Sequence, residues 1–128
     1  MRLNQITVEV SDILASRAFY QALGLRLIVS SDHYARFVCG PDEAGSSTFS
    51  IHLADPVRPF LGGVYFECDD VDARVTELKA AGIVFEHDPV DQRWLWREAW
   101  LVDPDSNRLC FYQAGENRIH PPWRVEPD

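Results

Sequence analysis

The sequence predicts an α+β domain in which two tandem βαβββ modules form a concave mixed β-sheet with the helices on the outside. Two observations carry this prediction. A strand-like alternation followed by an amphipathic helix occurs twice. The matching positions then recur at one common spacing: Asp12 and Asp70 are typical helix N-caps, and Gly24 and Gly82 are typical helix ends. A repeated motif of this kind indicates an internal duplication.

Each repeat is predicted to contain one helix and four strands. In the first repeat the strands are residues 6–12, 25–31, 34–39 and 48–54, around a helix at 13–24. In the second they are residues 63–69, 83–87, 97–102 and 108–113, around a helix at 71–82. The 128 residues should form a single domain, with module one at about 1–56, module two at about 62–114, and a C-terminal docking tail at 115–128.

Composition and charge exclude several classes of protein. The net charge of −8, with Lys and Arg scattered, disfavours nucleic acid as a partner. No apolar run approaches the roughly 20 residues of a membrane span, and the N-terminal stretch lacks the pattern of a signal peptide, so a cytoplasmic protein without membrane association is expected. Cys39, Cys68 and Cys110 are odd in number and have no CxxC spacing, which disfavours a disulfide framework or structural zinc.

Strand alternation divides the side chains between a helix-covered face and a trough. The residues expected to face the helices are Ile6, Val8, Val10, Phe49, Ile51, Val64, Phe66, Leu109 and Phe111. Those expected to face the trough are Gln5, Thr7, Glu9, Thr48, Ser50, His52, Gly63, Tyr65, Glu67, Arg108, Cys110 and Tyr112.

Three ordered motifs carry a family resemblance. "FYQALGL" follows the first strand, "DDVDARVTELKAAGIVF" follows the fifth, and "DPDSNRL" precedes the last. In this order the motifs resemble the vicinal oxygen chelate superfamily, which includes glyoxalase I, bleomycin-resistance proteins, extradiol dioxygenases and methylmalonyl-CoA epimerase. The resemblance covers roughly residues 3 to 114. It implies the glyoxalase/bleomycin-resistance fold, whereas the function varies within the superfamily.

The resemblance also implies four positions for ligands of a divalent metal ion, typically His, Glu or Gln. They fall on Gln5, Ser50, Gly63 and Cys110. Gln5 is compatible with that role, but a hydroxyl, a glycine and a thiol do not form the oxygen and nitrogen cage that such ions prefer. We therefore expect no metal site and no cofactor, and a divalent metal is the less favoured alternative.

The segment "DQRWLWREAW", residues 91–100, is the most distinctive in the chain. Strand spacing places Trp96, Glu98 and Trp100 on one face. Indole rings stack on planar or cationic ligands, but they also fill cores and dimer seams, and both interpretations remain open.

Several polar residues are candidates for chemistry. A carboxylate enclosed by aromatic rings, such as Glu98, could act as a general base, and His52 could take an acid–base or ligand-contacting role. Glu9 and Glu67 could hold a cationic ligand, or could be solvated residues paired with Arg36 or Arg108. Arg108 could alternatively bind an anionic group.

Three functions follow. The favoured one is a metal-free small-molecule-binding protein of the bleomycin-resistance kind, holding an aromatic or cationic ligand. The alternative is a glyoxalase-like lyase or isomerase, with an atypical metal site or with metal-free catalysis by Glu98 or His52. The third is a protein-interaction module. The expected ligand-binding residues are Gln5, Thr7, Glu9, Ser50, Tyr65, Glu67, Trp96, Trp100, Arg108, Cys110 and Tyr112. A homodimer is expected because relatives commonly dimerise and the tail carries Trp123, which would be costly to expose.

Overall fold

The computed structural model describes residues 1–58 and 60–126. The chain forms two compact units. The first comprises Met1–Val64 together with Val102–Arg108, and the second comprises Tyr65–Leu101 together with the chain from Leu109 onward. The turn at 102–108 thus belongs to the first unit, although it lies in the second repeat of the sequence.

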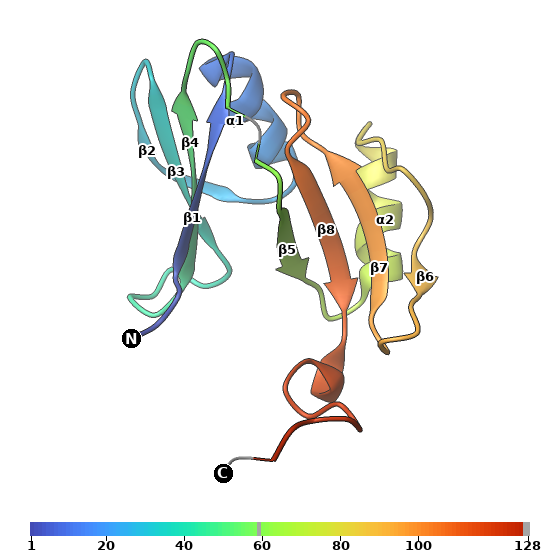
Figure 1. Ribbon diagram of the computed structural model, residues 1–128. Coiled ribbons are helices and arrows are strands. Elements are labelled where there is room, and N and C mark those ends of the chain that lie inside the picture. Colours follow the sequence, from blue (N-terminus) through green and yellow to red (C-terminus); the bar gives the residue numbers. More distant parts are fainter. Residues whose placement is uncertain (59, 127–128) are drawn as a thin grey trace. The chain divides into compact units, whose positions relative to one another are not determined.

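The first unit contains a four-stranded sheet in the order β1-β4-β3-β2. Its strands are β1 (Gln5–Val10), β2 (Arg26–Ser30), β3 (Tyr34–Cys39) and β4 (Ser47–Leu53). β1 runs parallel to β4, and the β4–β3 and β3–β2 pairs are antiparallel. Helix α1 (Ile13–Ala22) lies against one face of this sheet (Figure 1). The strands and helix predicted for the first repeat are therefore confirmed.

Local chemistry and core packing explain where α1 begins and how it is held. The Asp12 carboxylate accepts a hydrogen bond of 3.0 Å from the backbone N–H of Ala15, as an N-cap does. Gly24 has φ +100°, a conformation that ends the helix and favours glycine. Tyr20 of α1 packs on Phe37 and Phe49, with ring centroids 5.9 and 4.5 Å away. This buried face is the apolar one predicted from strand alternation.

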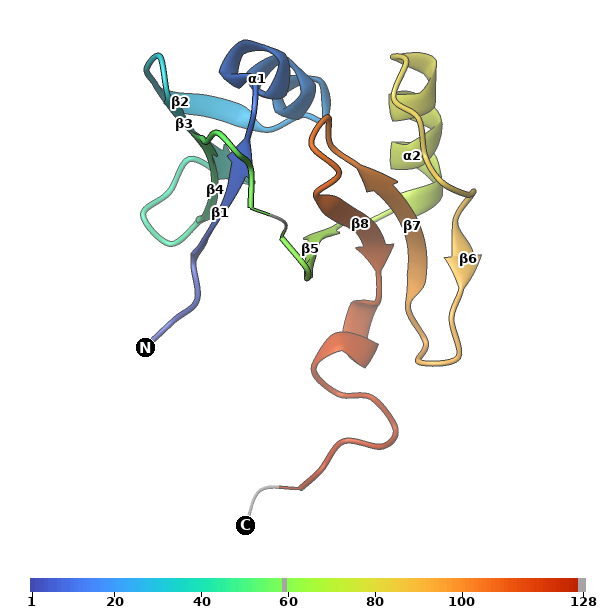
Figure 2. The same cartoon turned by 45° about the horizontal axis from the view of Figure 1, so that its top comes forward.

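The second unit contains most of a sheet in the order β5-β8-β7-β6. Its strands are β5 (Gly63–Glu67), β6 (Val90–Asp91), β7 (Arg97–Val102) and β8 (Arg108–Gln113). Helix α2 (Val71–Ala80) runs beside this sheet, and the short β6 forms its edge (Figure 2). Asp70 caps α2 by accepting a 3.0 Å bond from the N–H of Ala73, and Gly82 follows at φ +95°. The duplicated architecture predicted from the repeat is confirmed.

The strand predicted at 83–87 is wrong. That segment is irregular, and the strand in its place is β6, which pairs antiparallel with β7. Phe85 is buried and its ring lies 5.9 Å from that of Phe111, while the N–H of Glu86 donates to the carbonyl of Trp100 at 2.8 Å. The side chain of Phe85 is thus anchored in the core, and Pro89, which has no N–H, separates this anchor from the paired β6.

Beyond β8 the chain makes a short 3-10 helix, η1 (Gly115–Arg118). Trp123 is 56% exposed in the single chain, so burial of its indole would require a partner. Within the described ranges, no helix has the length and apolarity that a membrane crossing demands.

Candidate functional site

Four aromatic rings gather on the face of the second sheet that is opposite α2. Tyr65 of β5 meets Trp96, Trp100 and Tyr112 at centroid distances of 5.9, 5.3 and 5.9 Å, each nearly edge to face. Trp96 stacks on Tyr112 at 4.4 Å with an interplanar angle of 13°. We call these four residues the aromatic face. Strand alternation divides the residues of β8 between two faces. Tyr112 belongs to the aromatic face, and the preceding residue, Phe111, lies on the other, where its ring contacts those of Phe66 and Phe85.

A buried carboxylate lies within this aromatic environment. Glu98 of β7 is 3% exposed, and its two oxygens accept hydrogen bonds from the indole N–H groups of Trp94, at 2.7 Å, and Trp100, at 3.0 Å. A left-handed Leu95, φ +67°, forms the tight turn that separates Trp94 from β7. Both oxygens of the only acid on this strand are therefore engaged by indole donors.

The aromatic face is partly packed and partly open. Cys110, Tyr112 and Ala114 form a buried cluster, and Trp96 and Trp100 pack against it. Tyr65, in contrast, is 48% exposed. Trp96 thus packs against the core cluster by stacking, as a core-filling indole does. Tyr65 is half-exposed, so part of the aromatic face lies at the surface.

The face of the first sheet opposite α1 is polar. Thr7 of β1 and Ser50 of β4 are register partners, and their hydroxyl oxygens lie 2.6 Å apart. On β3, the Nε of Arg36 donates to the Tyr34 hydroxyl at 3.0 Å. Burial acts to raise the pKa of Tyr34, but hydrogen bonds with Ser50 and Arg36 and the charge of Arg36 outweigh it, so the pKa is lowered. We call Thr7, Tyr34, Arg36 and Ser50 the polar cluster.

Glu9 is held by the segment that follows β4. Its carboxylate accepts from the backbone N–H of Arg58 at 2.8 Å and forms an ion pair with that guanidinium. Hydrogen bonding to Arg58 lowers the pKa of Glu9. The ring of His52, the register partner of Glu9, lies 6.3 Å from that of His33. Glu9 thus pairs with Arg58, and Glu67 forms an ion pair with Arg118 at 3.6 Å.

The four positions implied for a metal ion do not offer a fitting donor set. The Gln5 amide oxygen already accepts from the Thr48 hydroxyl at 2.7 Å, and the buried Ser50 hydroxyl is bonded to Thr7. Gly63 has no side chain, and Cys110 is a fully buried thiol in the core cluster with Tyr112 and Ala114. Over residues 1–58 and 60–126, no group of three or more His, Cys, Asp and Glu side chains is arranged to hold a metal.

A hollow of about 570 Å³ opens at the end of the second sheet where β5 and β8 finish and β7 begins. Three carboxylates and Arg97 are the charged groups of its lining. Arg97 bonds one of them, Asp91, at 3.1 Å, and forms a two-point ion pair with Asp72 outside the lining, at 2.8 Å for both bonds. The lining residues are Glu67, Cys68, Asp69, Asp91, Leu95, Arg97, Gln113, Ala114 and Gly115. Of these, Glu67 alone was among the predicted site residues.

Eleven of the thirteen predicted site residues thus separate into two groups, whereas Glu67 lines the hollow and Arg108 is exposed at the start of β8. Tyr65, Trp96, Glu98, Trp100, Cys110 and Tyr112 come together in the second unit, and Gln5, Thr7, Glu9, Ser50 and His52 share one face of the first sheet. Sequence reasoning did not include Trp94, Tyr34, Arg36 or Arg58 among the site residues, although it named Arg36 as a possible ion-pair partner. Strand alternation in "YARFVC" indicates that Tyr34 and Arg36 share a face, but only the pairing of β3 with β4 brings Ser50 beside them.

Comparison with known proteins identifies the family. The model of the Glyoxalase/Bleomycin resistance protein/Dioxygenase superfamily matches residues 2–111, so the chain belongs to this superfamily. A search of curated proteins found no match.

Solved structures share the fold at low identity. A glyoxalase/bleomycin resistance protein/dioxygenase from Nocardioides is similar, with a TM-score of 0.76, 20% identity, and coverage of 98% of this chain and 90% of that one. A bleomycin resistance determinant encoded on the transposon Tn5 has a TM-score of 0.72, 20% identity, and coverage of 90% and 99%. A bleomycin-binding protein complexed with bleomycin has a TM-score of 0.70, 20% identity, and coverage of 88% and 98%.

Proposed function

We propose that this chain is a small-molecule-binding protein that works without a metal and holds an aromatic cation against the aromatic face. The observation that carries the proposal is the half-exposed ring of Tyr65, which meets three other aromatic rings with the buried Glu98 carboxylate beside them. The bleomycin-binding protein that shares this fold is consistent with a binding role.

The physical reason is electrostatic. The faces of aromatic rings carry partial negative charge and attract cations, with an energy of about 0.5–2 kcal/mol for each favourable contact. Glu98 places a carboxyl group in a poorly hydrated environment beside these rings, and the overall charge of −8 draws cations toward the protein. A flat cationic ligand could therefore stack on Tyr65 and gain from the carboxylate without displacing its indole donors.

Glu98 is better suited to this role than to general-base catalysis. A general base needs an oxygen within hydrogen-bond reach of the substrate proton. Both oxygens of Glu98 already accept from indoles, and the carboxylate is almost completely buried. This favours electrostatic stabilisation of a ligand over proton abstraction.

Tryptophan fluorescence tests the proposal. The full chain is titrated with benzyltrimethylammonium, an aromatic cation, and with benzyl alcohol, its uncharged counterpart. We expect saturable quenching by the cation and much weaker binding of the alcohol. Tyr65→Ala should weaken cation binding by roughly tenfold, because it removes the open ring. Trp123→Phe, in the tail, is the control and should leave the affinity unchanged. Equal affinity for both compounds, or no effect of Tyr65→Ala, would contradict the proposal.

Two further expectations accompany it. A homodimer is part of the proposal because the tail presents Trp123 and Val125, both well exposed, and a partner surface would cover them. The acidic, dispersed charge of the sequence disfavours nucleic acid as a partner, and a cytoplasmic location remains part of the proposal. Sedimentation of the full chain, with and without residues 119–128, tests the dimer.

A further inference from the structure

The polar cluster of the first sheet has features that the proposed function does not use. Arg36 and Tyr34 are half-buried on β3, and the Arg36 guanidinium lies 5.6 Å above the Tyr34 ring. Its Nε is bonded to the Tyr34 hydroxyl. No carboxylate within residues 1–58 or 60–126 forms an ion pair with Arg36. The bond to Tyr34 therefore orients the guanidinium, and no described carboxylate neutralises its charge.

The hydroxyls behind this arginine determine which groups remain available. Ser50 is completely buried between Thr7 and Tyr34 and bonds both of them. The Tyr34 oxygen has two hydrogen-bond partners: it is bonded to Ser50 and accepts from the Nε of Arg36. When Ser50 is the donor in its bond to Tyr34, the phenolic proton is left to point to a ligand. The cluster then presents one O–H donor and the two Nη groups of Arg36.

We propose that the polar cluster is a binding site for an oxyanion, with the terminal N–H groups of Arg36 and the O–H of Tyr34 as the donors. A guanidinium edge matches the two oxygens of a carboxylate or phosphate and binds them through paired, charge-assisted hydrogen bonds. Thr7 and Ser50 are positioning residues, since they act on the anion through Tyr34.

The surrounding charges are compatible with an anion. Glu9 is the acid closest in register, two residues from Thr7 on β1, and its charge is offset by the ion pair with Arg58. His52 is the register partner of Tyr34 and places an imidazole ring there, which carries no negative charge.

This inference is independent of the proposed function, because it uses residues of the first unit alone and predicts a ligand group of opposite charge. Its probes contain no aromatic ring, so that they do not report on the aromatic face. The full chain is titrated with acetate and, separately, with inorganic phosphate at constant ionic strength set by chloride. Binding is followed by NMR through the Nε–H signal of Arg36 and the amides of β3 and β4.

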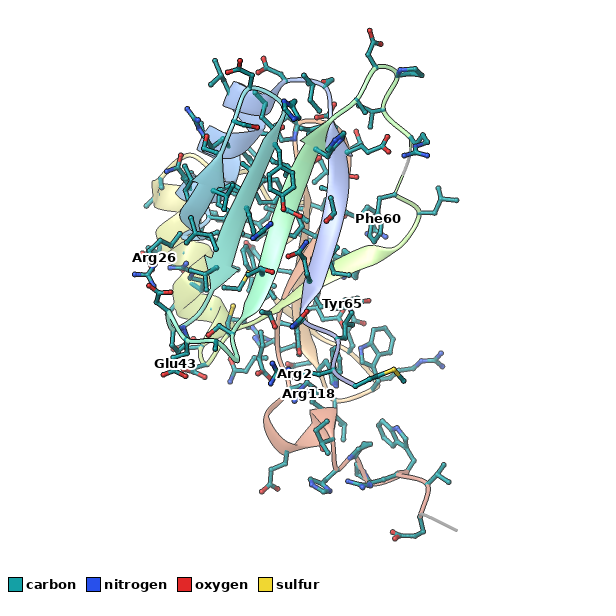
Figure 3. All side chains as sticks on the ribbon, turned by 90° about the vertical axis from the view of Figure 1, so that its left-hand side faces the viewer. Arg2, Arg26, Glu43, Phe60, Tyr65 and Arg118 are labelled. Atoms are coloured by element: carbon teal, nitrogen blue, oxygen red, sulfur yellow. The ribbon has the colours of Figure 1, made fainter. Side chains whose placement is uncertain are left out.

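We expect saturable shifts confined to β3 and β4 with at least one of the two anions, and the preferred anion identifies the group as a carboxylate or a phosphate. Arg36→Gln should weaken this binding by about tenfold or more, and Arg36→Lys, which keeps the charge but loses the paired donors, by less. Tyr34→Phe should weaken it severalfold. Arg26→Gln, on the β2 edge of the same sheet and exposed (Figure 3), is the control for charge alone. Shifts that chloride reproduces, unchanged binding by folded Arg36→Gln, or an equal loss in Arg26→Gln would overturn the inference.

Discussion

The hydroxyl of Tyr20 donates a 2.7 Å hydrogen bond to the Asp103 carboxylate, and both residues are buried. Asp103 also accepts from Asn107, through a backbone bond of 2.9 Å and a side-chain bond of 2.8 Å. The motif "DPDSN" thus forms a turn with internal hydrogen bonds, and its first carboxylate, that of Asp103, is hydrogen-bonded to Tyr20 of α1. Asn107 in turn donates to the carbonyl of Glu9 at 3.2 Å, so the turn also supports β1.

Removal of the Tyr20 hydroxyl should therefore destabilise the fold. Tyr20→Phe leaves the buried Asp103 carboxylate short of one donor, and we expect a loss of about 1–3 kcal/mol in the free energy of unfolding. Burial and the negative charge of Asp103 raise the pKa of Tyr20, so the pair should persist over the whole range in which the protein is folded. Urea denaturation measures the effect. Tyr112→Phe, a second buried tyrosine whose hydroxyl has no described hydrogen bond, should cost much less, and a comparable loss in both variants would contradict this account.

Substitution of Glu98 should disturb the tryptophans. In Glu98→Gln, one of the two indole N–H groups faces an amide N–H₂ in place of an acceptor oxygen, which should cost about 1–3 kcal/mol. Thermal unfolding measures the stability, and the tryptophan emission should shift because Trp94 or Trp100 loses its buried acceptor. The exposed Glu116→Gln is the matched control. Wild-type stability and emission in Glu98→Gln would show that the two indole bonds are unimportant.

The Arg97–Asp72 pair should make stability depend on acid pH. Hydrogen bonding to Arg97 lowers the pKa of Asp72 below its ordinary value of 3.8. A lowered pKa in the folded state stabilises the fold above the ordinary value, and the contribution is lost as pH falls through the lowered one. The stability difference between wild type and Asp72→Asn should thus be largest near neutral pH and vanish in acid. It should be small because the pair is exposed.

Denaturant titrations at several pH values measure this difference. Asp32→Asn, which removes an exposed carboxylate with no described ion pair, is the control and should change stability little at any pH. A difference that grows as the pH falls would have the wrong sign and would exclude the proposed role of Asp72.

Tyr34 should ionise before the buried tyrosines. Its pKa is lowered, whereas burial raises the pKa of Tyr20 and of Tyr112. An alkaline titration followed by tyrosinate absorbance should therefore begin with a phase that is absent from Tyr34→Phe. If that variant keeps the early phase, the hydrogen bonds of Tyr34 with Ser50 and Arg36 do not stabilise its ionised form.

Protein purified without a histidine tag should contain no divalent metal in stoichiometric amount, because the positions of Gln5, Ser50, Gly63 and Cys110 lack suitable donors. Elemental analysis measures this directly. Treatment with a chelator should leave thermal stability unchanged, since no metal would contribute to folding. A tightly held metal that is lost in Gln5→Ala would contradict both the metal-free assignment and the preference for binding over catalysis.

The sequence alone determined the duplicated fold, both helix caps and seven of the eight strands, because these depend on local periodicity and on turn residues such as Asp70 and Gly82. It also placed Trp96, Glu98 and Trp100 on one face. It could not show that Trp94 turns back to Glu98, since that contact depends on a left-handed Leu95. Nor could it show that Arg36 stands beside Ser50, or that Asp103 is fastened to Tyr20. Those relationships join residues far apart in the chain, and strand pairing and core packing alone decide which of them meet.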